Sequence, residues 1–330
     1  MRREFCTLFD SNYLFKAVAM HRSLLEHCPD FHLTAFCFDE AAASLLGELA
    51  LPELTAVTLP ELEEFDRELL SVKHDRTPVE YCWTATPALP RYMLGTRPEL
   101  EEITYLDADL LFFSDPEPLF QAMGSDSVLI TPHRYAPEYK HQEENGVYNV
   151  QFMVFRRDER GLGALEWWHD RCIEWCYYRL EDGKLGDQKY LDDWPERFEG
   201  VHVLEHKGGG LAPWNITRYD VHHEGDQVVV DSDPLVFFHF HSLRVLDDGG
   251  YDWRPPGYFI SPENRRLVYD PYMKALDAAV AEVRSTAPGF AAGMVPRPPL
   301  AERLRQAPGR AVVHARRLLA RRDPLAKVGA

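Results

Sequence analysis

Two carboxylates near position 108 are the side chains of this chain best suited to metal chemistry. Asp107 and Asp109 directly follow Glu102–Leu106, an apolar run with the composition of a buried strand. Two acidic side chains separated by one residue can hold a divalent cation jointly, and such an ion neutralises a diphosphate. An isolated Asp-x-Asp is more often a solvated turn. Its place at the end of a strand, where open α/β sheets bind ligands, favours the functional interpretation.

Two histidines in the run 237–241 form a second candidate group. Side chains two apart in a strand lie on the same face, so His239 and His241 would point to one side and the phenylalanines to the other. Imidazole together with two carboxylates suits Mn²⁺ or another borderline divalent ion better than Ca²⁺. Taken alone, the histidines fit a hydrogen-bonded surface pair equally well.

The tripeptide Gly186-Asp187-Gln188 is compatible with close approach to a ligand and also with helix capping. Capping is the commoner use of such residues. The sequence has neither of the glycine-rich signatures of P-loop and dinucleotide-binding proteins. Phosphate binding of those two kinds is therefore not expected.

The charge distribution separates an acidic body from a basic C-terminal tail. The 330 residues include 36 Lys or Arg and 53 Asp or Glu, a formal net charge of -17. Residues 296–330 hold nine basic and two acidic residues, a net +7, which leaves -24 for the rest. An acidic body repels phosphate backbones, so nucleic acid is not an expected partner. The sequence has no long apolar run and no apparent secretory signal, so we expect a cytoplasmic location.

The elements that must position these residues follow an alternation of strand-like and helix-like runs, which predicts an α/β fold with a largely parallel sheet. Period-two and buried apolar runs predict strands at Phe5–Phe9, His32–Phe38, Glu102–Leu106, Ser127–Ile130, Tyr148–Phe155, Val201–Leu204, Gln227–Val230 and Leu235–His241. Helical spacing predicts helices over 14–27, 40–50, 61–71, 85–94, Leu162–Arg179 and 263–284.

Breaks in these patterns divide the chain into a main domain of residues 1–260, a helical extension and linker at 261–295, and a basic tail at 296–330. Prolines and glycines at 287–289 and 296–299 mark the passage into the tail. Apolar residues among the arginines make the tail partly amphipathic, although Pro308-Gly309 interrupts a continuous helix. Attachment to an anionic membrane surface and a solvated end are equally open for this segment.

Five motifs in sequence order resemble those of nucleotide-sugar glycosyltransferases of the GT-A fold, most closely family 8, which includes glycogenin and bacterial lipopolysaccharide galactosyltransferases. TLFDSNYLFKAVAMHRSL is similar to the family's first strand and nucleotide-binding turn, and ITYLDADLLFFSDPEPLF to its metal-binding segment. YNVQFMVF resembles the strand that carries Asn-x-Gly, GDQKYL the Asp-Gln element, and HFHS the His-x-x-Gly. The match covers about residues 5–245, and five motifs in the right order are specific where the Asp-x-Asp alone is weak.

The resemblance implies a Rossmann-like GT-A fold, with a mixed, mostly parallel central sheet flanked by helices, and a role for each matched residue. Mn²⁺ or Mg²⁺ would be held by Asp107, Asp109 and His239, with His241 as the alternative third ligand. Asp187 and Gln188 would lie at the reacting carbon. The donor nucleotide sugar would be contacted by Asp10, Asn12, Tyr13, Asp107 and Asn149. Outside the family motifs, Arg244 would contact phosphate, and Asn215 would line the donor or the acceptor pocket.

The implied activity is transfer of a sugar from a nucleotide-diphosphate donor, expected to be a UDP-sugar, to a glycan, lipid-linked or lipopolysaccharide acceptor. The metal would stabilise the departing diphosphate. The resemblance implies retention of configuration, with Asp187 and Gln188 stabilising an oxocarbenium-like centre. Peripheral contact of the tail with the inner face of the membrane would suit such an acceptor.

The sequence departs from the family at several positions. Gln151 and Ser242 stand where the family has glycine, Arg91 is only the nearest substitute for a basic residue before Asp107, and the family's Lys-Pro-Trp is absent. Two other functions therefore stay open. One is a metal-dependent hydrolase of a nucleotide sugar or phosphoester, and the other is a nucleotide-sugar-binding module without turnover.

Overall fold

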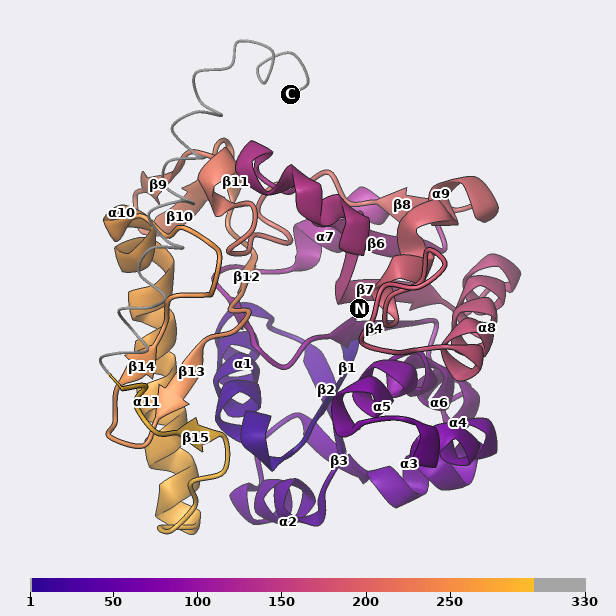
Figure 1. Ribbon diagram of the computed structural model, residues 1–330, viewed down its shortest axis with the longest axis horizontal. Coiled ribbons are helices and arrows are strands. Elements are labelled where there is room, and N and C mark those ends of the chain that lie inside the picture. Colours follow the sequence, from indigo (N-terminus) through magenta and orange to yellow (C-terminus); the bar gives the residue numbers. More distant parts are fainter. Residues whose placement is uncertain (1, 300–330) are drawn as a thin grey trace.

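A computed structural model describes residues 2–299, and a seven-stranded sheet runs through its centre (Figure 1). The strand order is β3-β2-β1-β4-β7-β6-β8. Only β7 runs antiparallel to its neighbours β4 and β6, so the sheet is mixed and mostly parallel, as predicted. The strands are β1 (Arg3–Phe9), β2 (Phe31–Cys37), β3 (Leu54–Thr58), β4 (Glu102–Leu106), β6 (Val128–Pro132), β7 (Tyr148–Arg156) and β8 (Val201–Val203).

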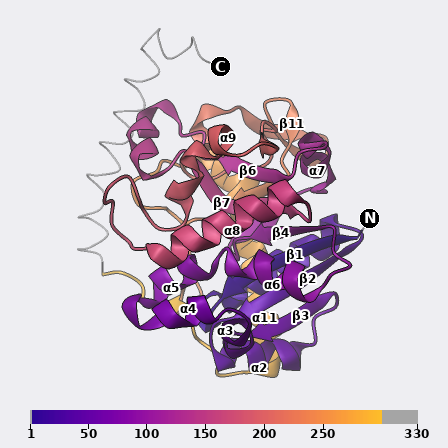
Figure 2. The same cartoon turned by 90° about the vertical axis from the view of Figure 1, so that its right-hand side faces the viewer.

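Helices cover both faces of the sheet, and Figure 2 shows α8 crossing one of them. One face carries α1 (Leu14–His27), α2 (Glu40–Leu49), α7 (Glu117–Met123) and α11 (Asp270–Thr286). The other carries α3 (Leu59–Phe65), α4 (Arg67–Val72), α5 (Pro78–Ala85), α6 (Ala88–Thr96), α8 (Glu159–Glu174) and α9 (Trp194–Arg197). Helix α10 (Pro262–Asn264) leads through a π-helical turn into α11. Short 3₁₀ turns lie at Ser11–Tyr13, Lys73–Asp75, Pro137–Asn145, Gln188–Asp193 and Ile216–Arg218.

Strand β7 shows why the central strands are apolar along their whole length. Phe152 and Val154 pack with residues of α1 and α7, whereas Met153 and Phe155 pack with residues of α8. Successive side chains of a strand point to opposite faces, and here both faces are covered by helices. The unbroken apolar run is therefore what a doubly covered strand requires.

Three smaller sheets lie beside the central one. Strand β5 (Leu110–Phe112) pairs antiparallel with β12 (Phe237–His239). Strands β9 (Val221–Glu224), β10 (Gln227–Val230) and β11 (Asp233–Pro234) form an antiparallel sheet. Strand β13 (Arg244–Leu246) lies between β14 (Tyr251–Asp252) and β15 (Met294–Val295). Its pairing with β15 attaches the last described residues to the segment that follows β12.

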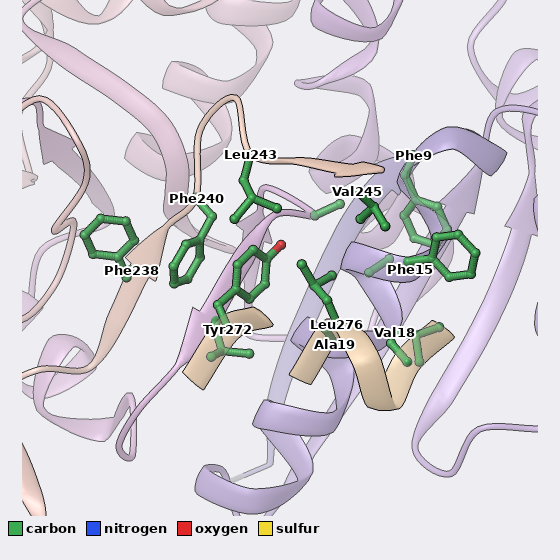
Figure 3. Close-up of a cluster of buried hydrophobic side chains, with 14 of the residues drawn as sticks. Phe9, Phe15, Val18, Ala19, Phe238, Phe240, Leu243, Val245, Tyr272 and Leu276 are labelled. Atoms are coloured by element: carbon green, nitrogen blue, oxygen red, sulfur yellow. The ribbon is translucent and has the colours of Figure 1, made fainter. Parts of the chain in front are cut away.

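The C-terminal helix α11 belongs to the hydrophobic core around α1. Figure 3 shows Tyr272 and Leu276 of α11 among side chains from α1 and from the segment after β12. The rings of Phe240 and Tyr272 stack with their centroids 3.7 Å apart. Residues 270–286 thus share a core with the first helix, while the boundary predicted after residue 260 stays a prediction. Among residues 2–299, no helix has the length and apolar composition needed to cross a membrane.

Several predicted elements differ from the structure. The helix expected over 61–71 is two helices, because the backbone leaves the helical region at Asp66 and its side chain caps α4 by accepting from the N–H of Leu69. The helix expected to reach Arg179 ends at Glu174, since Trp175 is extended. The strand expected over 235–241 is confined to three residues of β12. Strand β3 was not predicted.

Candidate metal and donor-binding site

Two chain segments far apart in sequence meet where β4 ends. Asp107 and Asp109 form the turn from β4 into β5, and the β5–β12 pairing places His239 opposite Leu110. The N–H of Phe240 donates to the carbonyl of Asp109 at 3.0 Å, which fixes this register. As a result, His239 Nε2 lies 3.0 Å from Asp109 Oδ1 and 3.8 Å from Asp107 Oδ2.

These three side chains fit a divalent cation. Each offers one ligand atom, and the three atoms lie within 4.8 Å of one another. Two carboxylate oxygens and one imidazole nitrogen are a donor set that suits Mn²⁺. Asp109 and His239 are buried, and burial raises the pKa of Asp107, as expected for a carboxyl that shares a dry site with another carboxylate. A dication would offset the two negative charges of this group.

Lys16 of α1 is a cation for which the sequence motifs predict no role. Its ammonium group lies 3.6 Å from Asp109 Oδ2 and 4.1 Å from the centroid of the Tyr13 ring. Burial lowers the pKa of Lys16, and the charge of Asp109 opposes that effect. Although burial alone would raise it, His239 and Lys16 hold the pKa of Asp109 well below its ordinary value. One feature of the sequence could have indicated the place of Lys16. It lies three residues after Tyr13 on a helix that begins in the predicted nucleotide-binding turn, and residues at this spacing are neighbours on a helix surface.

His241 differs from His239 in burial. Both rings contact Trp214, with centroid distances of 5.3 Å for His239 and 5.8 Å for His241. However, β12 ends at His239, and His241 is exposed. The group of ligand atoms found among residues 2–299 at this place includes His239 and not His241.

Asp187 is a buried carboxyl close to the aspartate pair. It is 4% exposed, and its Oδ2 has no hydrogen-bond partner among the residues that the structure describes. Burial raises the pKa of Asp187 to about 7; a hydrogen bond from Thr86 opposes the rise and the charge of Asp107 adds to it. Asp187 is therefore poised between its charged and neutral forms near neutral pH.

Gln188, next in the chain, belongs to a hydrogen-bonded group that also contains Asn149 and His133. The Asn149 side-chain N–H donates to Gln188 Oε1 at 3.3 Å, and Gln188 Nε2 donates to the carbonyl of Asn145 at 3.1 Å. Asn149 Nδ2 also lies 3.1 Å from His133 Nε2. Burial lowers the pKa of His133 to about 3, so this imidazole is neutral. The structure thus joins two of the predicted site residues, Asn149 and Gln188.

The turn after β1 carries three predicted donor residues. Asp10 accepts hydrogen bonds from the backbone N–H of Asn12 at 3.0 Å and from its side-chain amide at 2.8 Å. Asn12 Oδ1 accepts from the N–H of Gly293 at 3.1 Å, which attaches the β15 segment to this turn. The charge of Asp109 raises the pKa of Tyr13, because the turn borders the aspartate pair.

Two other predicted donor residues have partners elsewhere in the protein. Both amide hydrogens of Asn215 are used, one by the carbonyl of His133 at 2.8 Å and one by that of Gly210 at 2.9 Å. Asn215 therefore braces the loop before it. Arg244 lies on β13 with its side chain exposed, and its guanidinium lies 3.5 Å from the carboxylate of Asp252. The structure does not bring Arg244 into contact with the aspartate pair, and donor contacts by both residues stay predictions.

A second group with metal-binding residue types, Asp66, Glu68 and His169, is explained by the packing of α8. Asp66 Oδ2 lies 2.9 Å from the guanidinium of Arg91 and 2.8 Å from His169 Nε2. Arg91 also binds Glu166 on α8. The carboxylate is therefore already shared by two partners. Arg91, the sequence's nearest substitute for the family's basic residue, belongs to this ion network and not to the site at Asp107.

Comparison with known proteins relates the chain to bacterial proteins of its own length. No family model matches the sequence. The chain is 34% identical over 299 residues to the uncharacterized protein YfnD of Bacillus subtilis (strain 168). The aligned residues cover 89% of this chain and 94% of YfnD. It belongs to the YfnD family. The uncharacterized protein YfnF of the same organism is 34% identical over 254 residues, or 74% of this chain and 83% of YfnF.

Solved structures define the fold of this YfnD-family member. The galactosyltransferase LgtC, in complex with donor and acceptor sugar analogues, superimposes over 83% of this chain and 95% of LgtC with a TM-score of 0.53 and 13% identity. An active-site mutant of LgtC gives a TM-score of 0.50 with the same coverage and identity. The chain has the GT-A glycosyltransferase fold, and the resemblance stated from the motifs is confirmed at the level of the fold.

The two positions where this YfnD-family chain replaces a glycine are filled in different ways. Ser242 has φ +65°, so the backbone keeps the left-handed conformation that glycine adopts without strain. Gln151 is fully buried, and its side-chain oxygen lies 2.9 Å from His239 Nδ1. The first replacement keeps the local backbone shape, and the second adds a polar group behind the histidine.

Proposed function

We propose that the chain is a metal-dependent glycosyltransferase that moves a sugar from a UDP-sugar to a glycan, lipid-linked or lipopolysaccharide acceptor with retention of configuration. The observation that carries the proposal is the grouping of Asp107, Asp109 and His239 at the end of β4, beside the buried carboxyl of Asp187. The GT-A fold supports it, because open α/β sheets bind ligands at the carboxyl ends of their strands.

In this proposal Asp107, Asp109 and His239 hold Mn²⁺ or Mg²⁺, which when bound supplies positive charge to the diphosphate leaving group. The protein's own cation at this place is Lys16, whose ammonium group lies 3.6 Å from Asp109. It adds positive charge in a buried environment, where charge interactions are stronger than in water. The turn at Asp10–Tyr13, fixed by its hydrogen bonds to Asp10 and Gly293, orients the nucleotide.

Asp187 and Gln188 stabilise the positive charge that develops on the donor sugar as its bond to the diphosphate breaks. Ionised Asp187 is the effective form, because a neutral carboxyl provides no charge to oppose the oxocarbenium-like centre. Gln188 Oε1 is directed by the Asn149 amide, so the 3₁₀ turn that follows is tied to β7. We expect Asp187→Asn to lower kcat by about 100-fold or more, in the range seen when a preorganised electrostatic group is removed.

Product analysis tests the proposal. The full-length protein is incubated with UDP-sugars, Mn²⁺ and a panel of glycan and lipid-linked acceptors, and the products are separated by mass spectrometry. Transfer that is lost in Asp187→Asn and kept in Asp193→Asn supports the proposal, since Asp193 is exposed in the same turn and pairs with Arg197. Free sugar with every acceptor would identify a hydrolase, and donor binding without turnover would identify a binding module.

We also propose that residues 296–330 attach the enzyme to an anionic membrane surface. Their net charge of +7 supports this, against -24 for the remainder. Residues 300–330 lie outside the described residues, so the support is the sequence alone. Such attachment would bring the site to a lipid-linked or lipopolysaccharide acceptor.

A further inference from the structure

Gln151 occupies a central place in the site although the motifs predicted no role for its side chain. It lies on β7 beside the end of β4, where its carbonyl accepts from the N–H of Asp107 at 3.0 Å. Its own N–H donates to Asn149 Oδ1 at 2.9 Å. Its side-chain Oε1 lies 2.9 Å from His239 Nδ1, and both side chains are buried. One residue thus contacts two proposed metal ligands and the Asn149–Gln188 pair.

We propose that Gln151 is a positioning residue that sets the tautomer and ring orientation of His239 for metal binding. An amide oxygen can only accept, so a hydrogen bond from Nδ1 to Oε1 requires the proton on Nδ1. The neutral ring then presents Nε2 as the ligand atom, and Nε2 is the atom that faces Asp109 at 3.0 Å. The inference rests on the proposed function, because it takes His239 as a metal ligand.

The surroundings of His239 favour this assignment over simple space filling. Gln151 Nε2 is buried without a hydrogen-bond partner among the described residues, which is unfavourable for a residue that only fills a core. Among residues 2–299, the contact with His239 is the one hydrogen bond of the Gln151 side chain. The ring of His239 is further limited by Trp214, which meets it edge-on with centroids 5.3 Å apart. Trp214 restricts the ring's tilt, and Gln151 determines which nitrogen carries the proton.

Glutamine at position 151, where the resembled glycosyltransferase family has glycine, provides a side-chain acceptor for the metal-binding histidine. A glycine at this position supplies no side-chain acceptor, so it would leave Nδ1 of the metal histidine without this partner. Partners of the second ring nitrogen fix the orientation of metal-binding histidines and raise their basicity. In this chain β7 supplies that partner from the residue that also anchors Asp107.

Titration of the full-length protein with Mn²⁺ tests the inference without any substrate. Electron paramagnetic resonance measures the concentration of the free ion at each step. Gln151→Met removes the acceptor and keeps the volume, and we expect its Kd for Mn²⁺ to rise about 10- to 100-fold. Gln151→Glu keeps an acceptor oxygen at Nδ1, and its Kd should stay within about threefold of wild type. Thermal melting establishes that each variant is folded.

Thr131→Val is the matched control. Thr131 is fully buried on the adjacent strand β6, and its hydroxyl donates to the carbonyl of Phe152 at 2.9 Å. Its replacement removes a buried hydrogen bond near Gln151 without touching His239, so the Kd for Mn²⁺ should not change. A rise equal to that of Gln151→Met would show that general loosening of the sheet, not the contact with His239, weakens the site.

Two outcomes would overturn the inference, and they are distinguishable from failure of the proposed function. Wild-type affinity in Gln151→Met would contradict it while leaving metal binding intact. Equal loss in the Met and Glu variants would show that the acceptor oxygen is not what matters. If the wild-type protein binds no Mn²⁺, the metal-dependent function itself fails, and the role of Gln151 fails with it.

Discussion

At the scale of single residues, Asp187 combines a cost in stability with a proposed role in catalysis. Burial raises its pKa to about 7, whereas a carboxyl in the unfolded chain titrates near 4. Between these values the folded protein holds a proton that the unfolded chain has lost. The free energy of unfolding therefore falls as the pH rises through this window.

We predict that Asp187→Asn stabilises the metal-free protein more at pH 8 than at pH 5. The amide has no charge to bury, so the difference between the two gains should be about 2–3 kcal/mol. Urea denaturation at both pH values measures it. Asp193→Asn, an exposed change in the same turn, should show no such pH dependence. Equal gains for Asp187→Asn at both pH values would contradict the account of its pKa.

Ser242 is a second residue whose backbone makes a specific prediction. At φ +65° a side chain is strained, so Ser242→Gly should raise the free energy of unfolding by about 0.5–1 kcal/mol. The same change at Ser44, exposed in the middle of α2, should lower it by about 0.5 kcal/mol because glycine disfavours helix. Chemical denaturation of both variants checks the opposite signs. A loss of stability in Ser242→Gly would show that the serine side chain contributes more than the strain costs.

The sequence allows a prediction for those residues of the candidate site that a local sequence feature marks. Asp107 and Asp109 could be proposed as metal ligands from the sequence because their position after an apolar strand is a local feature. Lys16 and Gln151 were not, because each gains its meaning from a partner about 90 residues away in sequence. No local periodicity contains that information, and only the assembled sheet brings such pairs together.

At the scale of elements, the close contact between β15 and the turn after β1 joins the two ends of the described chain. Gly293 has φ +77°, and a Cβ atom there would lie 1.9 Å from the carbonyl oxygen of Asn12. Gly249 has a similar φ of +80°, with nothing within 4 Å of its Cβ position. Alanine at either position would strain the backbone, but only alanine at position 293 would also overlap with another atom. Comparing the two variants therefore separates backbone strain from steric overlap.

We predict that Gly293→Ala destabilises the protein by at least about 2 kcal/mol more than Gly249→Ala, which should cost only about 1 kcal/mol of strain. Because Asn12 must shift to relieve the overlap, Gly293→Ala should also weaken nucleotide binding. Denaturation and nucleotide titration measure the two effects. Equal destabilisation by both variants would contradict a close contact between these segments.

The elements that local patterns predicted well are those with complete local signals. Helix α1 has uninterrupted helical spacing, and β1, β4 and β7 are apolar strands covered on both faces. Strand β3 was missed because it lies at the sheet edge and is largely half-exposed, which removes the apolar signal. The β5–β12 pairing, which assembles the proposed metal site, joins residues more than 120 positions apart and leaves no trace in the local sequence.

At the scale of the whole molecule, an acidic body is joined to a basic tail, and the proposed membrane attachment follows from this charge separation. We predict that the full-length protein cosediments with vesicles rich in anionic phospholipid and much less with phosphatidylcholine vesicles. Replacing Arg316, Arg317, Arg321 and Arg322 by glutamine should weaken this binding by up to about 1,000-fold, at about 1 kcal/mol for each charge near the surface. Raising the salt concentration should weaken it as well.

Nucleotide binding by the four-arginine variant is the control for that experiment, and it should equal that of wild type. Vesicle binding that is unaffected by the substitutions, or equal on neutral lipid, would exclude the tail's arginines as the attachment. The catalytic proposal would then stand without the membrane proposal, because the two rest on different parts of the chain.

In the proposed function, Asp109 helps to hold a cation on which binding of a nucleoside diphosphate depends. Isothermal titration of UDP into the full-length protein, with and without Mn²⁺, tests this role in wild type, Asp109→Asn and Asp115→Asn. Asp115 is an exposed aspartate shortly after β5 and serves as the matched control. We predict binding that requires Mn²⁺ in wild type and Asp115→Asn and is lost in Asp109→Asn. Absence of UDP binding with Mn²⁺, or equal binding in all three proteins without it, would contradict the claim.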